Sequence, residues 1–142
     1  MRIDGVGTFV LTHKDGSVER FLKHNLIVTG GFDFICDVMG NAEQPTNMAF
    51  IGVGEGTDEA VASETSLQKE LARSTAVYAH AEGTKTFTLT AEFPEGVATG
   101  AITEAGVFNA DKGGIMLDRV TFAVINKGED DRFTATFQFT LS

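Results

Sequence analysis

The chain has no tryptophan, a single tyrosine and two prolines among its 142 residues. Almost all of its aromatic side chains are the 12 phenylalanines, which lack the polar group that Trp and Tyr offer at wet, ligand-facing surfaces. Glycan clefts usually present such aromatic platforms, so the composition disfavours carbohydrate cleavage and tight glycan binding. The scarcity of proline leaves no proline-rich linker or recognition segment.

Cysteine is also scarce, because Cys36 is the only one. An intramolecular disulfide is therefore excluded. The neighbours Phe34, Ile35 and Val38 favour a small, buried, apolar Cys36 side chain over a reactive thiol.

Long apolar runs and an excess of positive charge are both missing. No segment approaches the roughly 20 apolar residues that span a bilayer, and residues 1–5 lack the apolar core of a signal peptide. We therefore expect cytosol-like conditions. With 20 acidic and 11 basic residues the formal net charge is −9, which repels nucleic-acid phosphates and anionic lipids. We expect neither nucleic-acid nor membrane binding.

What is present is an ordinary globular composition, 42% hydrophobic and 22% charged. A chain of this length falls in the commonest size range of one domain, and no internal repeat is found. Residues 1–142 are therefore predicted to form a single β-rich domain.

Strand patterns dominate. Residues 7–12 and 18–22 flank an Asp15-Gly16 step that is typical of a hairpin, and residues 47–53 form an apolar strand. Apolar and polar residues alternate over 86–93 and most clearly over 133–141, which predicts strands with one buried face. Residues 101–110 and 115–125 are joined by a turn at 111–114, and a second turn follows at 126–131, as in successive antiparallel hairpins.

Two short helices are predicted as well. Over residues 29–40, apolar residues recur from Val28 at helical spacing, with Thr29 as N-cap and Gly40 at C′. Thr65 and Gln68 fit a capping box that opens a helix ending near Arg73. The fold class is thus mainly β, an antiparallel β-sandwich with two short helices.

Residues 52–57, Gly-Val-Gly-Glu-Gly-Thr, superficially resemble a phosphate-binding loop. They lack the Gly-Lys-Ser/Thr ending and the following helix, and Glu55, Asp58 and Glu59 would repel a phosphate. The glycines are better explained by positive φ or by close approach of a neighbouring backbone.

No metal, cofactor or catalytic site is predicted. The acidic loop that continues to Ser63 and the run 129–131 lack the ligand spacing of a calcium loop, which favours solvated loops. His13, His24 and His80 are scattered, and Cys36 has no local base. We expect a protein that is not an enzyme; a small hydrolase stays an alternative, because catalytic triads assemble through space.

Four charged residues, Glu104, Asp118, Arg119 and Lys127, interrupt apolar, strand-like surroundings. Three interpretations are open: pairing within the fold, pairing across a subunit boundary, or charges at hairpin edges that discourage aggregation. Gly106, just before Val107 and Phe108, indicates a bulge or a close packing point. These five residues are the candidates for a role in assembly or in specifying the fold.

Several segments together, in this order and spacing, resemble small structural proteins of tailed-bacteriophage particles of the tail-fibre or baseplate type. The most distinctive is Ile102–Ala110. The others are residues 25–31, 50–57, 65–73, 113–122 and 125–127.

The resemblance implies a virion component, assembled in the host bacterial cytoplasm as a homo-oligomer, with a trimer as the expected state. Its partners would be other virion proteins and copies of itself, and it implies no catalytic residues. We expect a tail- or baseplate-associated fibre or adaptor subunit. The alternatives are a capsid-decorating (cement) protein of the phage head and a host receptor-binding module.

Overall fold

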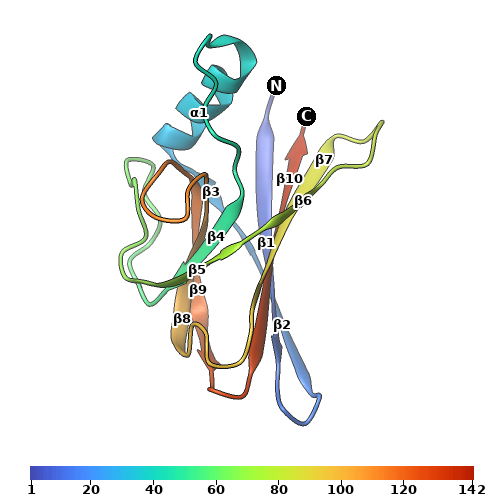
Figure 1. Ribbon diagram of the computed structural model, residues 1–142, viewed down its shortest axis with the longest axis vertical. Helices are drawn as coiled ribbons and strands as arrows, with labels where there is room; N and C mark the ends of the chain where they lie inside the picture. Colours follow the sequence, from blue (N-terminus) through green and yellow to red (C-terminus); the bar gives the residue numbers. More distant parts are fainter.

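Two antiparallel sheets of five strands each and one helix make up the protein, as a computed structural model of residues 1–142 shows (Figure 1). Sheet A has the strand order β2-β1-β10-β7-β6 and sheet B the order β3-β9-β8-β4-β5. The strands of sheet A are β1 (Ile3–Thr12), β2 (Val18–His24), β6 (Val77–Ala79), β7 (Thr86–Phe93) and β10 (Arg132–Leu141). Those of sheet B are β3 (Leu26–Ile27), β4 (Phe50–Gly54), β5 (Glu70–Thr75), β8 (Gly100–Phe108) and β9 (Met116–Lys127). The predicted antiparallel β-sandwich is confirmed.

Sheet A shows the predicted alternation. Phe133, Phe137 and Phe139 of β10 are fully buried, whereas the intervening Thr134 and Thr136 are only half-buried. β10 pairs with β1 along its whole length and with β7 from Phe133 to Thr140, so every second residue of these three strands points between the sheets.

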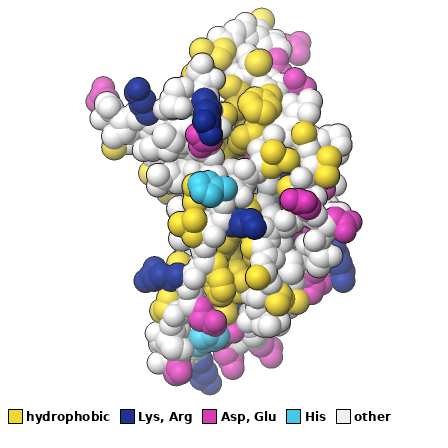
Figure 2. Space-filling view, turned by 180° about the vertical axis from the view of Figure 1, so that it is seen from behind, with side chains coloured by type: hydrophobic (Ala, Val, Ile, Leu, Met, Phe, Trp, Pro, Cys, Tyr) yellow, Lys and Arg dark blue, Asp and Glu magenta, His cyan; other side chains and the backbone are white.

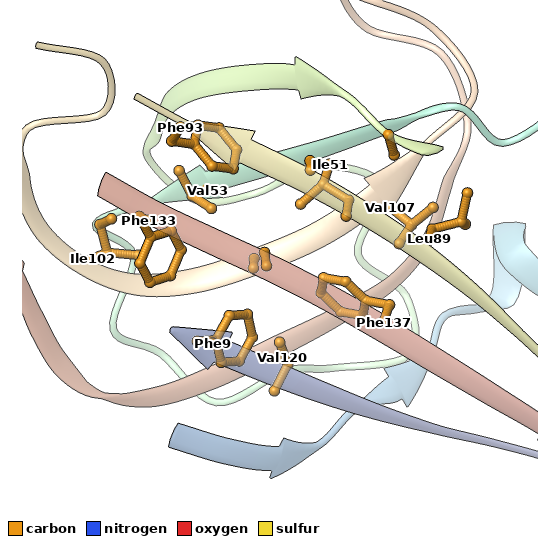
Figure 3. Close-up of a cluster of buried hydrophobic side chains, with 14 of the residues drawn as sticks. Phe9, Ile51, Val53, Leu89, Phe93, Ile102, Val107, Val120, Phe133 and Phe137 are labelled. Carbon is orange, nitrogen blue, oxygen red and sulfur yellow. The ribbon is translucent and has the colours of Figure 1, made fainter. Parts of the chain in front are cut away.

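The core lies between the two sheets and is rich in phenylalanine (Figure 3). The ring of Phe9 in β1 lies 4.4 Å from that of Phe122, 5.9 Å from Phe133 and 6.0 Å from Phe137, measured between centroids. Sheet B contributes aliphatic side chains, among them Ile51, Val53, Ile102, Val107 and Val120. Phenylalanine is thus core filling in sheet A.

Sheet B does not alternate, because both of its faces are covered. Burial is continuous from Ile102 to Phe108 in β8 and from Met116 to Val120 in β9. The long loop 55–69 places Leu67 against Phe108 and Met116 in a second, smaller apolar cluster. Charged residues in these strands are consequently buried whichever way they point.

The helix α1 (Thr29–Gly40) forms where expected, but its packing face differs from the prediction. Gly31, Phe34, Ile35 and Val38 face the sandwich, and Gly31 lies so close to the carbonyl of Leu117 that no Cβ atom fits there.

Several details predicted for this helix are therefore wrong. Phe32 and Met39 are exposed, and so is Cys36, because it lies off the packing face. The N-cap is Val28 rather than Thr29, and Gly40 is the last helical residue rather than C′.

The second predicted helix is absent. Residues 65–69 are irregular, and the chain from Glu70 onward is strand β5. The N–H groups of Gln68 and Lys69 donate to the carboxylate of Glu104 at 2.9 and 2.8 Å, and the Gln68 side chain bonds to Asp58 rather than to Thr65. These two amides thus bond to Glu104, a tertiary partner, instead of taking part in a helix.

Candidate functional site

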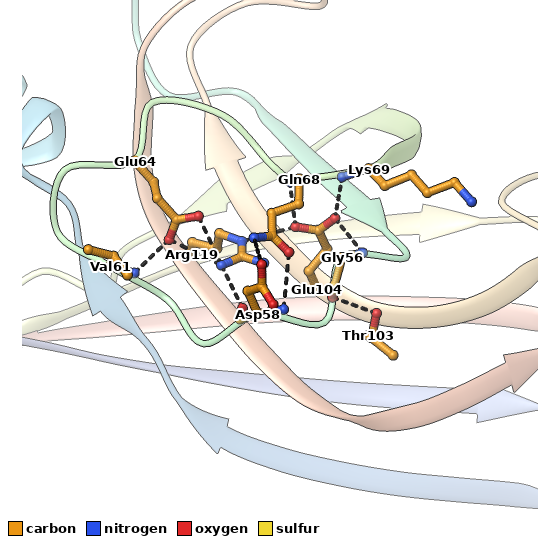
Figure 4. Close-up of polar contacts among 9 residues, drawn as sticks. All are labelled: Gly56, Asp58, Val61, Glu64, Gln68, Lys69, Thr103, Glu104 and Arg119. Carbon is orange, nitrogen blue, oxygen red and sulfur yellow. Dashed lines mark hydrogen bonds and ion pairs between the residues drawn. The ribbon is translucent and has the colours of Figure 1, made fainter.

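Glu104 of β8 is the centre of a buried polar network (Figure 4). Its carboxylate accepts hydrogen bonds from the backbone N–H of Gly56 at 2.7 Å, Gln68 at 2.9 Å and Lys69 at 2.8 Å. Arg119 Nε donates a fourth bond at 2.9 Å. A buried carboxylate needs such donors, and here three of them come from the two ends of loop 55–69.

Arg119 of β9 is fully buried and extends the network outward along the same loop. Its Nη1 donates to the carbonyl of Asp58 at 3.0 Å and to both carboxylate oxygens of Glu64 at 3.1 Å. Its Nη2 is buried without a hydrogen-bond partner. The guanidinium thus lies between two carboxylates, which balances its charge in the interior.

The network fastens loop 55–69 to the outer face of sheet B. Thr103 Oγ1 donates to the carbonyl of Gly56 at 2.7 Å, and Glu64 also accepts from the N–H of Val61 at 2.6 Å. Sequence reasoning missed Glu64. In the sequence, Glu64 is only one more acidic residue at the end of a polar loop. Its partner Arg119 lies 55 positions away.

The glycines of residues 52–57 have a structural explanation. A Cβ atom at Gly56 would lie 2.6 Å from Cβ of Gln68, and one at Gly54 would collide with the backbone of Lys69. The predicted close approach of a neighbouring backbone is confirmed, and it lets Glu104 reach the loop.

Gly106 is also a close packing point. A Cβ atom there would lie 2.6 Å from the carbonyl oxygen of Asp118 in β9. Gly106 pairs regularly with Arg119, while the β8–β9 register shifts on either side of it, between Ile102 and Glu104 and between Val107 and Phe108. The close packing is confirmed, and the bulges lie next to Gly106 rather than at it.

Asp118 is fully buried beside β3. Its carboxylate accepts the N–H of Val107 at 3.0 Å and a bond from the side-chain amide of Asn25, whose oxygen has no partner. Burial raises the pKa of Asp118 to about 7, and these two bonds offset only part of that shift.

Lys127, at the end of β9, is buried and donates to the carbonyl of Pro94 at 3.0 Å. Burial lowers the pKa of its ammonium group, while Asp131 and Glu95 oppose the shift. The bond ties the end of β9 to the segment that follows β7.

All four predicted charged residues therefore lie inside the domain. Glu104 and Arg119 pair within the fold, as one interpretation expected. The interpretation as edge charges is wrong for Glu104, because β8 lies between β9 and β4. None of the four side chains is accessible for pairing across a subunit boundary.

His13 forms the clearest titratable cluster on the surface. Its Nδ1 lies 3.0 Å from Asp131 and its Nε2 lies 2.6 Å from Glu19. These bonds raise the pKa of His13, with the bond to Glu19 contributing most. The imidazole thus joins the tip of the β1–β2 hairpin to the β9–β10 turn.

An apolar cleft of about 550 Å³ opens at the end of the sandwich that carries α1 and both chain termini. Eleven of its twelve lining residues are hydrophobic. They include Phe34, Ile35 and Val38 of α1 on one side and Tyr78, Phe87 and Leu89 of sheet A on the other. Large accessible apolar surfaces of this kind mark binding sites.

Further apolar side chains surround this end. Phe32 and Met39 of α1 are exposed. Seen from behind, hydrophobic side chains also gather near the end that carries α1 (Figure 2). The α1 end therefore has more accessible apolar surface than the cleft alone.

The single helix is too short to cross a membrane. Protein-family models, curated proteins and solved structures were all compared with the chain, and none matches it.

Proposed function

We propose that the chain is a non-enzymatic structural subunit of a tailed-bacteriophage virion, a tail- or baseplate-associated fibre or adaptor protein that acts by packing against other protein chains. Several segments, from residues 25–31 to 125–127, resemble such proteins in their order. This resemblance supports the proposal that the chain belongs to a phage particle. The apolar cleft between α1 and sheet A is the observation that carries the mode of action.

The cleft suits a protein partner for two reasons. Its walls offer apolar side chains and few polar groups to orient a small molecule. The buried charges Glu104 and Arg119 already bind each other and loop 55–69, so their role is to hold the scaffold. Contact area for a partner is then supplied by the apolar end of the sandwich.

The test is incorporation of variants into particles. Val38→Glu places a charge at the mouth of the cleft, where docking would bury it without a partner. We expect the amount of the variant in purified particles to fall by about tenfold or more, with the melting temperature of the free protein unchanged. Val124→Glu is the matched control, because Val124 is exposed to a similar extent, 50% against 43%, and lies outside the cleft.

Reconstruction of the particle supplies the location. Density for the domain on the tail or baseplate supports the proposal, and density on the capsid facets would replace it with a capsid-decorating role. Equal incorporation of both variants, or absence of the chain from particles, would refute docking through the cleft.

A further inference from the structure

The outer face of sheet A is continuous, and its central strands are rich in threonine. Outward residues of β10 and β7 include Thr134, Thr136, Thr88 and Thr90. The strand registers place these residues in straight rows that cross the sheet from β2 to β7, and two of the rows continue to β6.

Charge on this face is balanced. Besides His24, it carries Asp4, Arg20, Glu92 and Arg132, while the chain as a whole has a net charge of −9. Asp4 pairs with Arg2 at 3.2 Å and Arg132 with Glu95 at 3.8 Å. Arg20 and Glu92 take part in none of the ion pairs of the chain.

These two unpaired charges belong to one row. Arg20 is opposite Val10, Val10 is opposite Thr134, and Thr134 is opposite Glu92. Three strand spacings of about 4.8 Å separate them by roughly 14 Å. They cannot pair within one molecule.

We propose that two copies of the chain pack through this face about a two-fold axis that runs parallel to the strands, between β1 and β10. This operation sets β2 of each copy against β7 of the other, and β1 against β10. It therefore sets Arg20 of each copy against Glu92 of the other, because the two residues lie equally far from the axis. One contact forms two identical ion pairs, as a self-complementary interface requires.

The neighbouring row supplies apolar contact. It runs from Leu22, which is 66% exposed, through Thr8, Thr136 and Thr90 to Val77, which is 70% exposed. The same axis brings Leu22 of one copy against Thr90 of the other, next to Val77. The four strands that face each other, β2, β1, β10 and β7, give roughly 550 Å² per copy. The total of about 1,100 Å² is the size of a weak, reversible interface.

The two-fold contact shares with the proposed function only the expectation that protein chains pack together. It leaves the cleft free for another partner. A trimer, the state expected from the resemblance, would need a different contact in addition.

The experiment is a charge swap, followed by sedimentation from about 1 μM to about 1 mM. We expect wild type to associate reversibly to a dimer. Arg20→Glu and Glu92→Arg should each weaken association about tenfold or more, because each turns two attractions into two repulsions. The double variant, Arg20→Glu with Glu92→Arg, should restore the dissociation constant to within about threefold of wild type.

Controls separate this contact from general charge effects. Lys112→Glu and Glu129→Arg make the same changes of net charge at exposed hairpin turns and should leave association unchanged. At concentrations where the proteins are monomeric, all variants should keep the wild-type melting temperature. A protein that stays monomeric up to about 1 mM, or single variants that the double swap does not rescue, would overturn the proposal. Neither result depends on whether the chain occurs in a virion.

Discussion

Two buried carboxylates, Asp118 and Glu104, lie in neighbouring strands with different surroundings. Glu104 accepts four hydrogen bonds and faces a guanidinium. Asp118 accepts two bonds, and no cation pairs with it. The difference explains why burial dominates at Asp118 and raises its pKa to about 7.

The raised pKa of Asp118 predicts a pH-dependent contribution to stability. In the unfolded chain its pKa is near the ordinary 3.8, so between about pH 4 and pH 7 the folded state binds more protons. The stability that Asp118 contributes is therefore fully present below about pH 4 and is lost as the pH rises to about 7. The difference between a pKa of 3.8 in the unfolded chain and about 7 in the folded one corresponds to roughly 4 kcal/mol.

Asp118→Asn should remove this contribution, because the new amide cannot ionise. We expect the free energy of unfolding of wild type to fall relative to the variant between pH 4 and pH 7, measured by urea denaturation. Asp111→Asn, at an exposed turn, is the control. Parallel curves for wild type and Asp118→Asn would contradict the assignment.

At the scale of elements, loop 55–69 depends on the sheet beneath it. Glu104→Gln removes the negative charge that holds three loop amides and Arg119, although Glu64 still pairs with the guanidinium. We expect a loss of about 2 to 3 kcal/mol in unfolding free energy. In the Glu104→Gln variant, the amides of Gly56, Gln68 and Lys69 should exchange hydrogen faster than those of β10.

Hydrogen exchange followed by NMR measures the protection of these three amides. Glu59→Gln, in the exposed part of the loop, is the matched control. That change should cost less than about 0.5 kcal/mol. Unchanged protection of the three amides in Glu104→Gln would show that apolar contacts such as those of Leu67 are enough to hold the loop.

The elements also show how far sequence patterns reach. Strands β7 and β10 could be predicted, because one face of each strand packs against the core and the other faces water. Apolar and polar residues therefore alternate along them. Strand β5 could not be predicted, because the signal at Thr65 and Gln68 is local, whereas the partner that decides the structure, Glu104, is distant in sequence.

The same limit applies to the candidate site. The charged residues Glu104 and Arg119 stood out against apolar neighbours. The pairing of Arg119 with Glu64 could not be predicted, because it depends on the path of a loop that shows no periodic pattern. The cleft was also unpredictable, since it lies between α1 and strands β6 and β7, which are far apart in the sequence.

At the scale of the whole molecule, Phe137 tests whether the sandwich unfolds as one unit. It is fully buried among aromatic rings, so Phe137→Ala should cost about 3 to 5 kcal/mol. Thr136→Ala should cost less than about 1 kcal/mol, although its hydroxyl lies 3.2 Å from that of Thr90. Circular dichroism and the fluorescence of Tyr78, the only tyrosine, should report the same midpoint in each variant. Equal losses for the two variants would mean that both faces of β10 are buried.

The strand order of sheet A has a consequence for how the chain acquires its fold. β10 lies in the centre of the sheet, between β1 and β7, yet it follows all the other strands along the chain. During synthesis no strand connects the β1–β2 pair to the β6–β7 pair until β10 has left the ribosome. The sandwich therefore closes only after translation has passed β10, and pairing of β1 with β10 makes this a slow, long-range step.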